Sequence, residues 1–290
     1  MNNPVIMHIN YCEQGQSFPE LCKKAAAWGF DGIEFRGARL DGVKQSAEEY
    51  LDVITSSMKA AGLKFALFGH PLSNFNVPDA AARAEEAARS VRFYRLAKER
   101  LGARFACSNC FAGPMMNPDK KVASDAYDKH GSGCATPQQW EWAVEGYRII
   151  ASEVEKLGVR LAFETHMNYL HDTVQAARQL VDRIGSPAVG INIDYVNQVY
   201  FPTFPTLKEA VALAGDRLYY VHLKNCISVP GAGKFATALE EGEVNNRQFL
   251  RLLKDAGFSG PVCVEAPRPG DREWFARQDL AYVRSVMKDI

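Results

Sequence analysis

The sequence lacks an excess of charge of either sign, because 34 Lys and Arg residues balance 34 Asp and Glu residues over 290 positions. A net charge of zero gives no bulk attraction to nucleic acid or to an anionic membrane, so neither partner is expected. Apolar runs are also short, and none approaches the roughly 20 residues needed to span a bilayer. The first residues lack the basic and apolar segments of a signal peptide. We therefore expect an ordinary globular protein.

Cysteine is scarce and odd in number, and the seven residues are scattered along the chain. This usage excludes a disulfide framework and favours a reducing, cytoplasmic compartment. Cys107 and Cys110 form one C-x-x-C pair, but the second pair of a zinc ribbon is missing. We expect both thiols simply to pack within a strand.

Apolar, β-type runs alternate with amphipathic, helix-type patterns along the whole chain. Expected strands lie at 5–10, 31–37, 63–70, 103–110, 159–166, 188–197, 218–225 and 261–267. Expected helices lie at 18–29, 46–62, 79–101, 138–158, 173–185, 207–215, 245–257 and 271–289. Eight such units predict an α/β fold, a (β/α)8 TIM barrel in a single domain over residues 1–290. A doubly wound open sheet is the alternative, but no GxGxxG follows the first strand.

One long segment, residues 111–136, interrupts this rhythm after the fourth strand. It is rich in Gly, Pro, Asn, Asp and Lys and has no periodicity. A loop of this length in a compact domain is usually functional or disordered. Met115 and Met116, with Phe111, either cover a substrate as a lid or pack against the barrel rim.

Ionisable side chains end four consecutive late strands. They are Glu164 with His166, Asp194, which the neutral Asn197 follows, His222 with Lys224, and Glu265. One acidic residue at a strand end is compatible with a bridge to a surface Arg, but active-site groups of barrels come from these ends. Three carboxylates brought together would repel one another, and a divalent cation removes that conflict. Three carboxylates and one imidazole suit one Mn²⁺ or Mg²⁺ ion, and Co²⁺ or Zn²⁺ is also able to bind. Lys224 would meet substrate oxygens beside the metal.

At these residues the chain resembles the xylose isomerase-like TIM barrels, the sugar phosphate isomerase/epimerase superfamily. The segments that carry the resemblance are WGFDGIEFRG, LAFETH, INIDYVN, VHLKN, EEGEVNNRQFLRLLKDAGFSG and VCVEAP. The resemblance assigns the metal ligands to Glu164, Asp194, His222 and Glu265. It also implies that Glu164 and Glu265 form the catalytic acid/base pair. Family members are often dimers or tetramers, which is compatible with a homo-oligomer.

The sequence departs from relatives at several positions. Asn197 stands where members often have a His, and Asn109 where the DNA repair branch needs one. The loop after the seventh strand has no Asp-x-His, which argues against a three-zinc phosphodiesterase. The same loop lacks the Arg of free-ketohexose 3-epimerases, and Asn225 replaces a frequent Asp.

Weaker candidates surround this ligand set. For substrate binding we consider His70, His166, Asn197, Lys224 and Arg268. His70 and His166 end strands, and each is equally compatible with an ordinary structural role. Arg36 and Arg268 suit a phosphate or carboxylate, although strand-end Arg residues often pair with nearby acids. The GAGK at 231–234 is far short of a phosphate-binding P-loop, and we expect a flexible loop there.

The resemblance implies a metal-dependent isomerase or epimerase of a small sugar, sugar acid or sugar phosphate. Protons would move through a metal-stabilised enediolate. The alternative on the same site is a dehydratase, an inosose- or dehydroshikimate-type lyase, which the net loss of water would distinguish. A nuclease for abasic DNA and a barrel that only binds sugars are the remaining alternatives.

Overall fold

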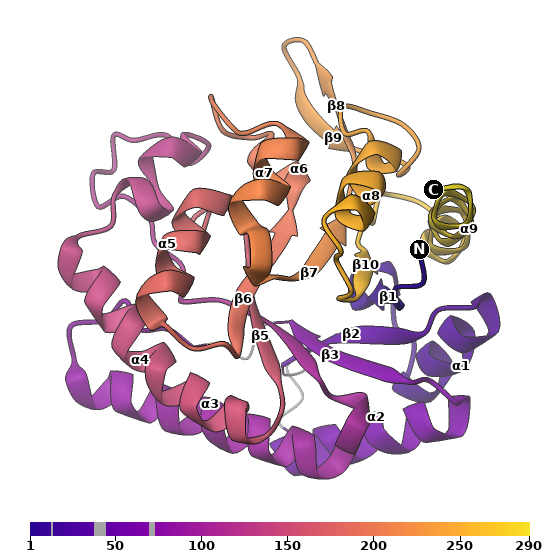
Figure 1. Cartoon of the computed structure of the whole chain (residues 1–290), viewed down its shortest axis with the longest axis horizontal. Coiled ribbons are helices and arrows are strands. Elements are labelled where there is room, and N and C mark those ends of the chain that lie inside the picture. Colours follow the sequence, from indigo (N-terminus) through magenta and orange to yellow (C-terminus); the bar gives the residue numbers. More distant parts are fainter. Residues whose placement is uncertain (13, 38–44, 70–72) are drawn as a thin grey trace.

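The computed structural model describes residues 1–12, 14–37, 45–69 and 73–290. Eight parallel strands form one sheet in the order β3-β2-β1-β10-β7-β6-β5-β4, and helices cover its outside (Figure 1). The strands are β1 (Val5–His8), β2 (Gly32–Arg36), β3 (Phe65–Gly69), β4 (Cys107–Cys110), β5 (Arg160–Glu164), β6 (Val189–Asp194), β7 (Leu218–Leu223) and β10 (Val262–Val264). The two ends of this order meet where the Ser108 Oγ donates a hydrogen bond to the Phe68 carbonyl oxygen at 2.9 Å. The predicted single-domain TIM barrel is therefore confirmed.

Apart from the short helix Tyr195–Gln198, which begins inside the predicted strand 188–197, the described α-helices lie within two residues of their predicted ranges. They are α1 (Phe18–Trp28), α2 (Ala47–Ala61), α3 (Ala80–Leu101), α4 (Pro137–Lys156), α5 (Val174–Ile184), α6 (Tyr195–Gln198), α7 (Leu207–Ala214), α8 (Asn246–Asp255) and α9 (Arg272–Asp289). Ser46 and Glu49 form the predicted capping box of α2. Gly29 ends α1 with a φ of 100°, a conformation that glycine adopts without a steric penalty.

The core has two parts, separated by the sheet. A large cluster of buried apolar side chains packs between the strands and the outer helices. A small cluster fills the space enclosed by the strands and consists of Ile6, Leu67, Cys107, Ala162, Tyr219, Tyr220 and Cys263. The chain ends lie side by side (Figure 1), and the Met1 ammonium donates to the Met287 carbonyl oxygen at 2.9 Å.

Several strands are shorter than predicted, and the difference matters for function. The first strand ends at His8, and Ile9–Tyr11 form a 3-10 turn. The sixth ends at Asp194, whose carboxylate accepts from the Asn197 N–H at 3.3 Å and starts α6. Asn10 and Asn197, which lie at the ends of two predicted strands, thus belong to a 3-10 turn and to a short helix that follow the observed strands.

After β7 the chain forms a hairpin that the sequence did not predict. Strands β8 (Cys226–Val229) and β9 (Gly233–Ala236) pair antiparallel, and they project from the barrel (Figure 1). The GAGK stretch makes the turn and starts β9, so it is part of a hairpin and not an unstructured loop.

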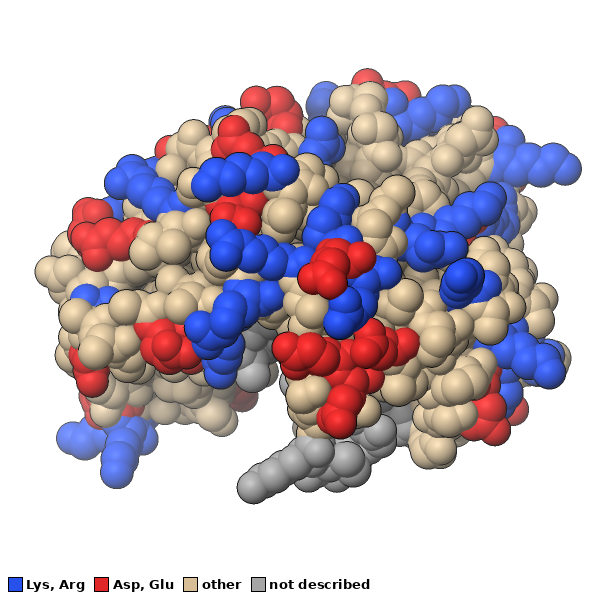
Figure 2. All heavy atoms as spheres, turned by 90° about the horizontal axis from the view of Figure 1, so that it is seen from below, with Lys and Arg blue, Asp and Glu red and all other residues tan. Residues whose placement is uncertain are grey.

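Basic and acidic side chains are interspersed over the face that α2 and α3 form (Figure 2). Pairs such as Arg95–Glu153 at 2.6 Å and Arg100–Asp52 at 2.7 Å join neighbouring helices there. Among the described residues, no helix is both long and apolar enough to cross a membrane.

Candidate metal centre

The four predicted ligands converge at one end of the barrel. They come from four neighbouring strands in the order β10-β7-β6-β5. Glu164 and Asp194 are the last residues of β5 and β6, His222 lies one residue before the end of β7, and Glu265 follows β10. One ligand atom from each residue lies within 4.8 Å of all the others, and all four residues are buried.

The cluster is organised around the imidazole of His222. Its Nδ1 atom lies 2.6 Å from Glu265 Oε2, 3.6 Å from Glu164 Oε2 and 4.0 Å from Asp194 Oδ2. Asp194 Oδ2, His222 Nδ1 and Glu265 Oε2 are buried, and the close contacts among them and with Lys224 are ion pairs. Three carboxylates held this close together repel one another unless cations neutralise them. Carboxylate and imidazole ligand atoms that face a common point fit a metal ion.

Lys224 supplies a positive charge to the same atoms. Its Nζ lies 2.6 Å from Asp194 Oδ2, 3.2 Å from Glu265 Oε2 and 4.0 Å from Glu164 Oε1. Burial lowers the pKa of Lys224, but the carboxylates, Asp194 foremost, raise it well above its usual value. Lys224 is therefore an ammonium ion that partly neutralises the three carboxylates.

The two glutamates have pKa values that move in opposite directions. Burial raises the pKa of Glu164 above its usual value, and His222 and Lys224 only partly offset this. Burial also acts to raise the pKa of Glu265, but His8, Lys224 and His222 together hold it well below the usual value. In the metal-free protein Glu164 is thus the carboxylate that takes a proton more readily.

Neutral amides hold both glutamates in place. Asn109 Nδ2 donates to Glu164 Oε2 at 2.6 Å, and Asn197 Nδ2 donates to Glu164 Oε1 at 3.2 Å. Asn10 Nδ2 donates to Glu265 Oε1 at 3.1 Å. Asn10 is a residue of this site that the sequence did not predict.

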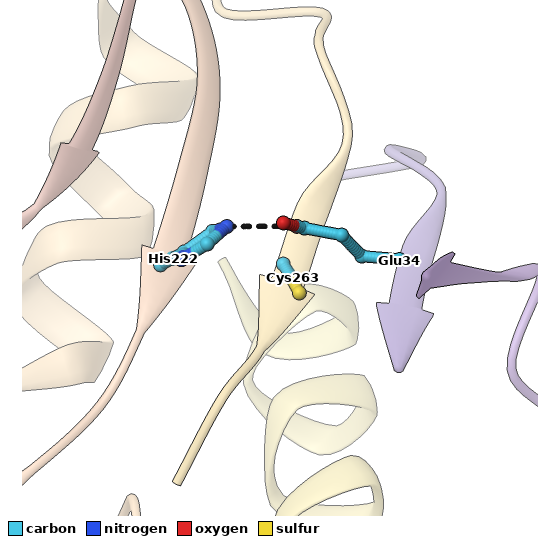
Figure 3. Close-up of side chains that lie close together, drawn as sticks. All are labelled: Glu34, His222 and Cys263. Carbon is cyan, nitrogen blue, oxygen red and sulfur yellow. Dashed lines mark hydrogen bonds and ion pairs between the residues drawn. The ribbon is translucent and has the colours of Figure 1, made fainter. Parts of the chain in front are cut away.

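Glu34 was also missed, and it lies directly behind the ligand set. The carboxylate is fully buried and accepts from His222 Nε2 at 2.9 Å (Figure 3). His8 Nε2 lies 3.8 Å from Glu34 Oε1 and 3.7 Å from Glu265 Oε1. Burial acts to raise the pKa of Glu34, but His222, together with His8 and Tyr220, outweighs burial, so the pKa falls to about 2. The only sign of Glu34 in the sequence was one acidic residue within the otherwise apolar start of the strand GIEFR.

The remaining predicted substrate-binding residues have different surroundings. Asn197 and Lys224 lie at the cluster, as described above. His166 is half-buried, its Nδ1 lies 2.9 Å from the Met167 carbonyl oxygen, and its ring contacts Phe111 edge to face. His70 lies outside the described residues.

The two arginines considered for anion binding differ from each other. Arg268 donates to Asp279 Oδ2 at 2.8 Å, and its guanidinium lies over the Phe275 ring. Arg36 contacts Asn10 Oδ1, and Asn10 in turn holds Glu265. Arg36 therefore contacts the cluster indirectly, through the side-chain amide of Asn10. Arg268 instead forms an ion pair with the buried carboxylate of Asp279.

The long segment 111–136 packs against residues that follow β5. Phe111 and Met115 are buried, whereas Met116 is 49% exposed. The Met115 N–H donates to the Asn168 carbonyl oxygen at 2.6 Å, and Pro114 forms an isolated bridge with Tyr169. Cys107 and Cys110 are buried free thiols in β4.

A model of one protein family matches residues 22–286, and its description is xylose isomerase-like TIM barrel. The chain therefore belongs to the xylose isomerase-like TIM barrel family. No curated protein matches the sequence with significance.

Solved structures share the fold at low sequence identity. One is a xylose isomerase-like TIM barrel protein from Mycobacterium smegmatis in complex with magnesium, with a TM-score of 0.75, 19% identity and coverage of 100% of this chain and 99% of that chain. A second is D-allulose 3-epimerase from Methylomonas sp., with a TM-score of 0.73, 18% identity and 98% of each chain covered. A third is the probable 3-DHS dehydratase AsbF from Bacillus anthracis, with a TM-score of 0.74, 18% identity and coverage of 98% and 99%.

Proposed function

We propose that this protein is a divalent-metal-dependent isomerase or epimerase of a small sugar, sugar acid or sugar phosphate. The observation that carries the proposal is the cluster of three buried carboxylates and one imidazole, which offers one ligand atom from each residue within 4.8 Å of all the others. The residues that would hold the ion are Glu164, Asp194, His222 and Glu265. This oxygen-rich set suits Mn²⁺ or Mg²⁺ best.

The reaction transfers a proton at a carbon next to a carbonyl group. When bound, a divalent cation supplies Lewis-acid stabilisation of the negative charge that develops on the substrate oxygen. Glu164 removes or returns the proton on one face. Glu265 does so on the other face or at the adjacent carbon. Their strands, β5 and β10, are separated by β6 and β7, which supports carboxylates acting from two sides. General acid–base catalysis of this kind is worth about 100- to 10,000-fold in rate.

The surrounding residues would bind and orient the substrate. Lys224 carries a positive charge beside Asp194 and Glu265, where it can donate to a substrate hydroxyl or carbonyl oxygen. Asn197 and Asn109 hold the Glu164 carboxylate by hydrogen bonds to its two oxygens. That support keeps the carboxylate fixed while it exchanges a proton, which limits the reorganisation needed in the transition state.

A dehydratase is the second candidate, because the probable 3-DHS dehydratase has a fold as similar as that of the epimerase. It would begin with the same proton removal and then expel a β-hydroxyl group. Incubating the Mg²⁺-loaded protein in D₂O with ketoses, sugar acids, inososes and their phosphates separates the two. Proton NMR of an isomerase product shows deuterium next to the carbonyl and an unchanged carbon skeleton. A product that has lost one water assigns the protein to the dehydratases.

Two isosteric substitutions test the acid/base pair. Glu164→Gln and Glu265→Gln should each abolish turnover while circular dichroism and thermal unfolding show a folded protein. Glu85→Gln is the matched control, since the Glu85 side chain is 67% exposed on α3 and pairs with Arg92. Wild-type rates in either active-site variant would refute the assignment.

A further inference from the structure

The buried carboxylate of Glu34 has no part in the proposed ligand set, yet it is one of the most thoroughly bonded groups in the barrel. Its Oε2 accepts from His222 Nε2 at 2.9 Å and from the Tyr220 hydroxyl at 2.5 Å. Its Oε1 accepts from Asn109 Nδ2 at 3.2 Å. In Figure 3 the Glu34 side chain extends from β2 toward His222, which reaches back from β7. Burying a carboxylate charge in the barrel interior costs free energy, so the role of this hydrogen-bonded charge needs an explanation.

A second metal site is the first explanation to consider, because Glu34, His222 and Cys263 lie close enough to share an ion. The bonds argue against it. Tyr220 and Asn109 already donate to the carboxylate, and the His222 Nε2 atom carries the proton that Glu34 accepts. Burial also raises the pKa of the Cys263 thiol well above its usual value, which disfavours the thiolate that a metal needs. Cys263 is a packing neighbour in the barrel interior.

The imidazole of His222 has two nitrogens with different surroundings. Nε2 lies on Glu34, whereas Nδ1 lies among Glu265, Glu164 and Asp194. A neutral imidazole bears one proton, and the hydrogen bond made by one nitrogen decides which lone pair is left for a metal. A carboxylate that accepts from the distal N–H also makes the other nitrogen a better donor.

We propose that Glu34 is the positioning residue of the metal centre: it holds the His222 proton on Nε2 and so presents the Nδ1 lone pair to the ion. This inference rests on the proposed metal site. Asn109 extends the same support to a second ligand, because its Nδ2 donates both to Glu34 and to Glu164. The Asn109 side-chain oxygen accepts from Asn192 Nδ2 at 3.2 Å, which fixes the orientation of the amide. One buried network thus orients His222 and Glu164 together.

The variant Glu34→Gln tests the proposal without a large change in volume. The glutamine amide can donate to Nε2 of His222, which would move the imidazole proton to Nδ1, where the metal should bind. Affinity for Co²⁺, measured by competition with a chelating dye on chelator-treated protein, should fall about 10- to 100-fold. Asp172→Asn is the matched control, because Asp172 is also a buried carboxylate but accepts from the Ser132 N–H in segment 111–136. Its Co²⁺ affinity should stay within twofold of wild type.

A direct readout on the wild-type protein keeps the proposal testable if Glu34→Gln does not fold. Long-range ¹⁵N NMR of histidine-labelled, Zn²⁺-loaded protein should show a proton on Nε2 of His222 and the metal on Nδ1, with the signals assigned by His222→Asn. Zinc on Nε2, or Co²⁺ affinity unchanged in a folded Glu34→Gln, would overturn the role of Glu34 alone. A wild-type protein that binds neither ion would overturn the metal site as well.

Discussion

Replacing Lys224 with Met should separate the stability of the metal-free protein from that of the metal-loaded protein. The Lys224 ammonium lies 2.6 Å from Asp194 and 3.2 Å from Glu265, and its side chain is 19% exposed. Removing one member of a buried ion pair costs about 3–5 kcal/mol, because the other charge stays buried without a partner. In the metal-free protein, Lys224→Met should therefore lower the free energy of unfolding by about that amount.

The effect on the unfolding temperature follows from chain length. At about 2.1 cal/mol/K per residue, 290 residues give an unfolding entropy of about 0.6 kcal/mol/K. A loss of 3–5 kcal/mol then corresponds to a fall in Tm of about 5–8 °C. A divalent ion bound to the same carboxylates would take over their neutralisation. The loss should therefore be much smaller with saturating Mn²⁺, and the metal-induced rise in Tm should be larger in the variant than in wild type.

Differential scanning calorimetry with chelator and with Mn²⁺ measures both quantities. Lys24→Met is the control, because Lys24 pairs with Glu273 at 2.5 Å but its side chain is 40% exposed. Exposed pairs are worth at most about 1 kcal/mol, so its Tm should change by less than about 2 °C under either condition. An equal loss of stability in Lys224→Met with and without Mn²⁺ would refute the idea that Lys224 and the metal neutralise the same carboxylates.

Three further outcomes are expected. Burial raises the pKa of Asp172 to about 6, so the folded state keeps a proton that the unfolded state loses near pH 4. The contribution of Asp172 to the free energy of unfolding should thus fall by up to about 3 kcal/mol as pH rises from 4 to 6. Urea titrations of Asp172→Asn over this pH range should lack that fall, and a pH profile identical to that of wild type would contradict the assignment. Gly131→Ala should lose about 1–3 kcal/mol, because Gly131 has a φ of 50° and a Cβ would lie 2.1 Å from Asp172 Oδ2. Faster proteolysis within 111–136 should accompany this loss, and a wild-type Tm would count against it. Iodoacetamide should label Cys134 first, because the other six cysteines are buried; peptide mass spectrometry that finds Cys107 labelled first would oppose this.

The sequence predicted the barrel because each signal for it is local. Capping residues such as Ser46 with Glu49 mark a helix start through bonds within a few residues. Runs of apolar, β-type residues bounded by turn residues likewise predicted the eight strands from local sequence. The convergence of the four candidate ligands was also predictable, since residues at the ends of parallel strands must meet at one mouth of the barrel. Asp194 and His222 indeed lie opposite each other in the register of β6 and β7.

Features that depend on distant pairs were not predictable. Glu34 is 188 positions from His222 and 75 from Asn109, so the fold alone brings its bonds together. Asn10 was assigned to a strand, because no local pattern showed that the strand would end at His8. The hydrogen bond from Arg268 to Asp279 likewise depends on the packing of α9, the helix that carries Asp279. The β8–β9 hairpin was missed because its strands are four residues each and largely exposed, so they lack a buried apolar pattern.

The central claim is that the four residues at the barrel mouth form one divalent metal centre. The most direct test is equilibrium dialysis of chelator-treated protein against Mn²⁺, with metal and protein quantified by mass spectrometry and amino-acid analysis. The account predicts one ion per chain in wild type and loss of tight binding in Asp194→Asn, because Asp194 contributes one of the three buried carboxylates of the cluster. No bound ion in a folded wild-type protein, or one tightly bound ion that persists in Asp194→Asn, would contradict it.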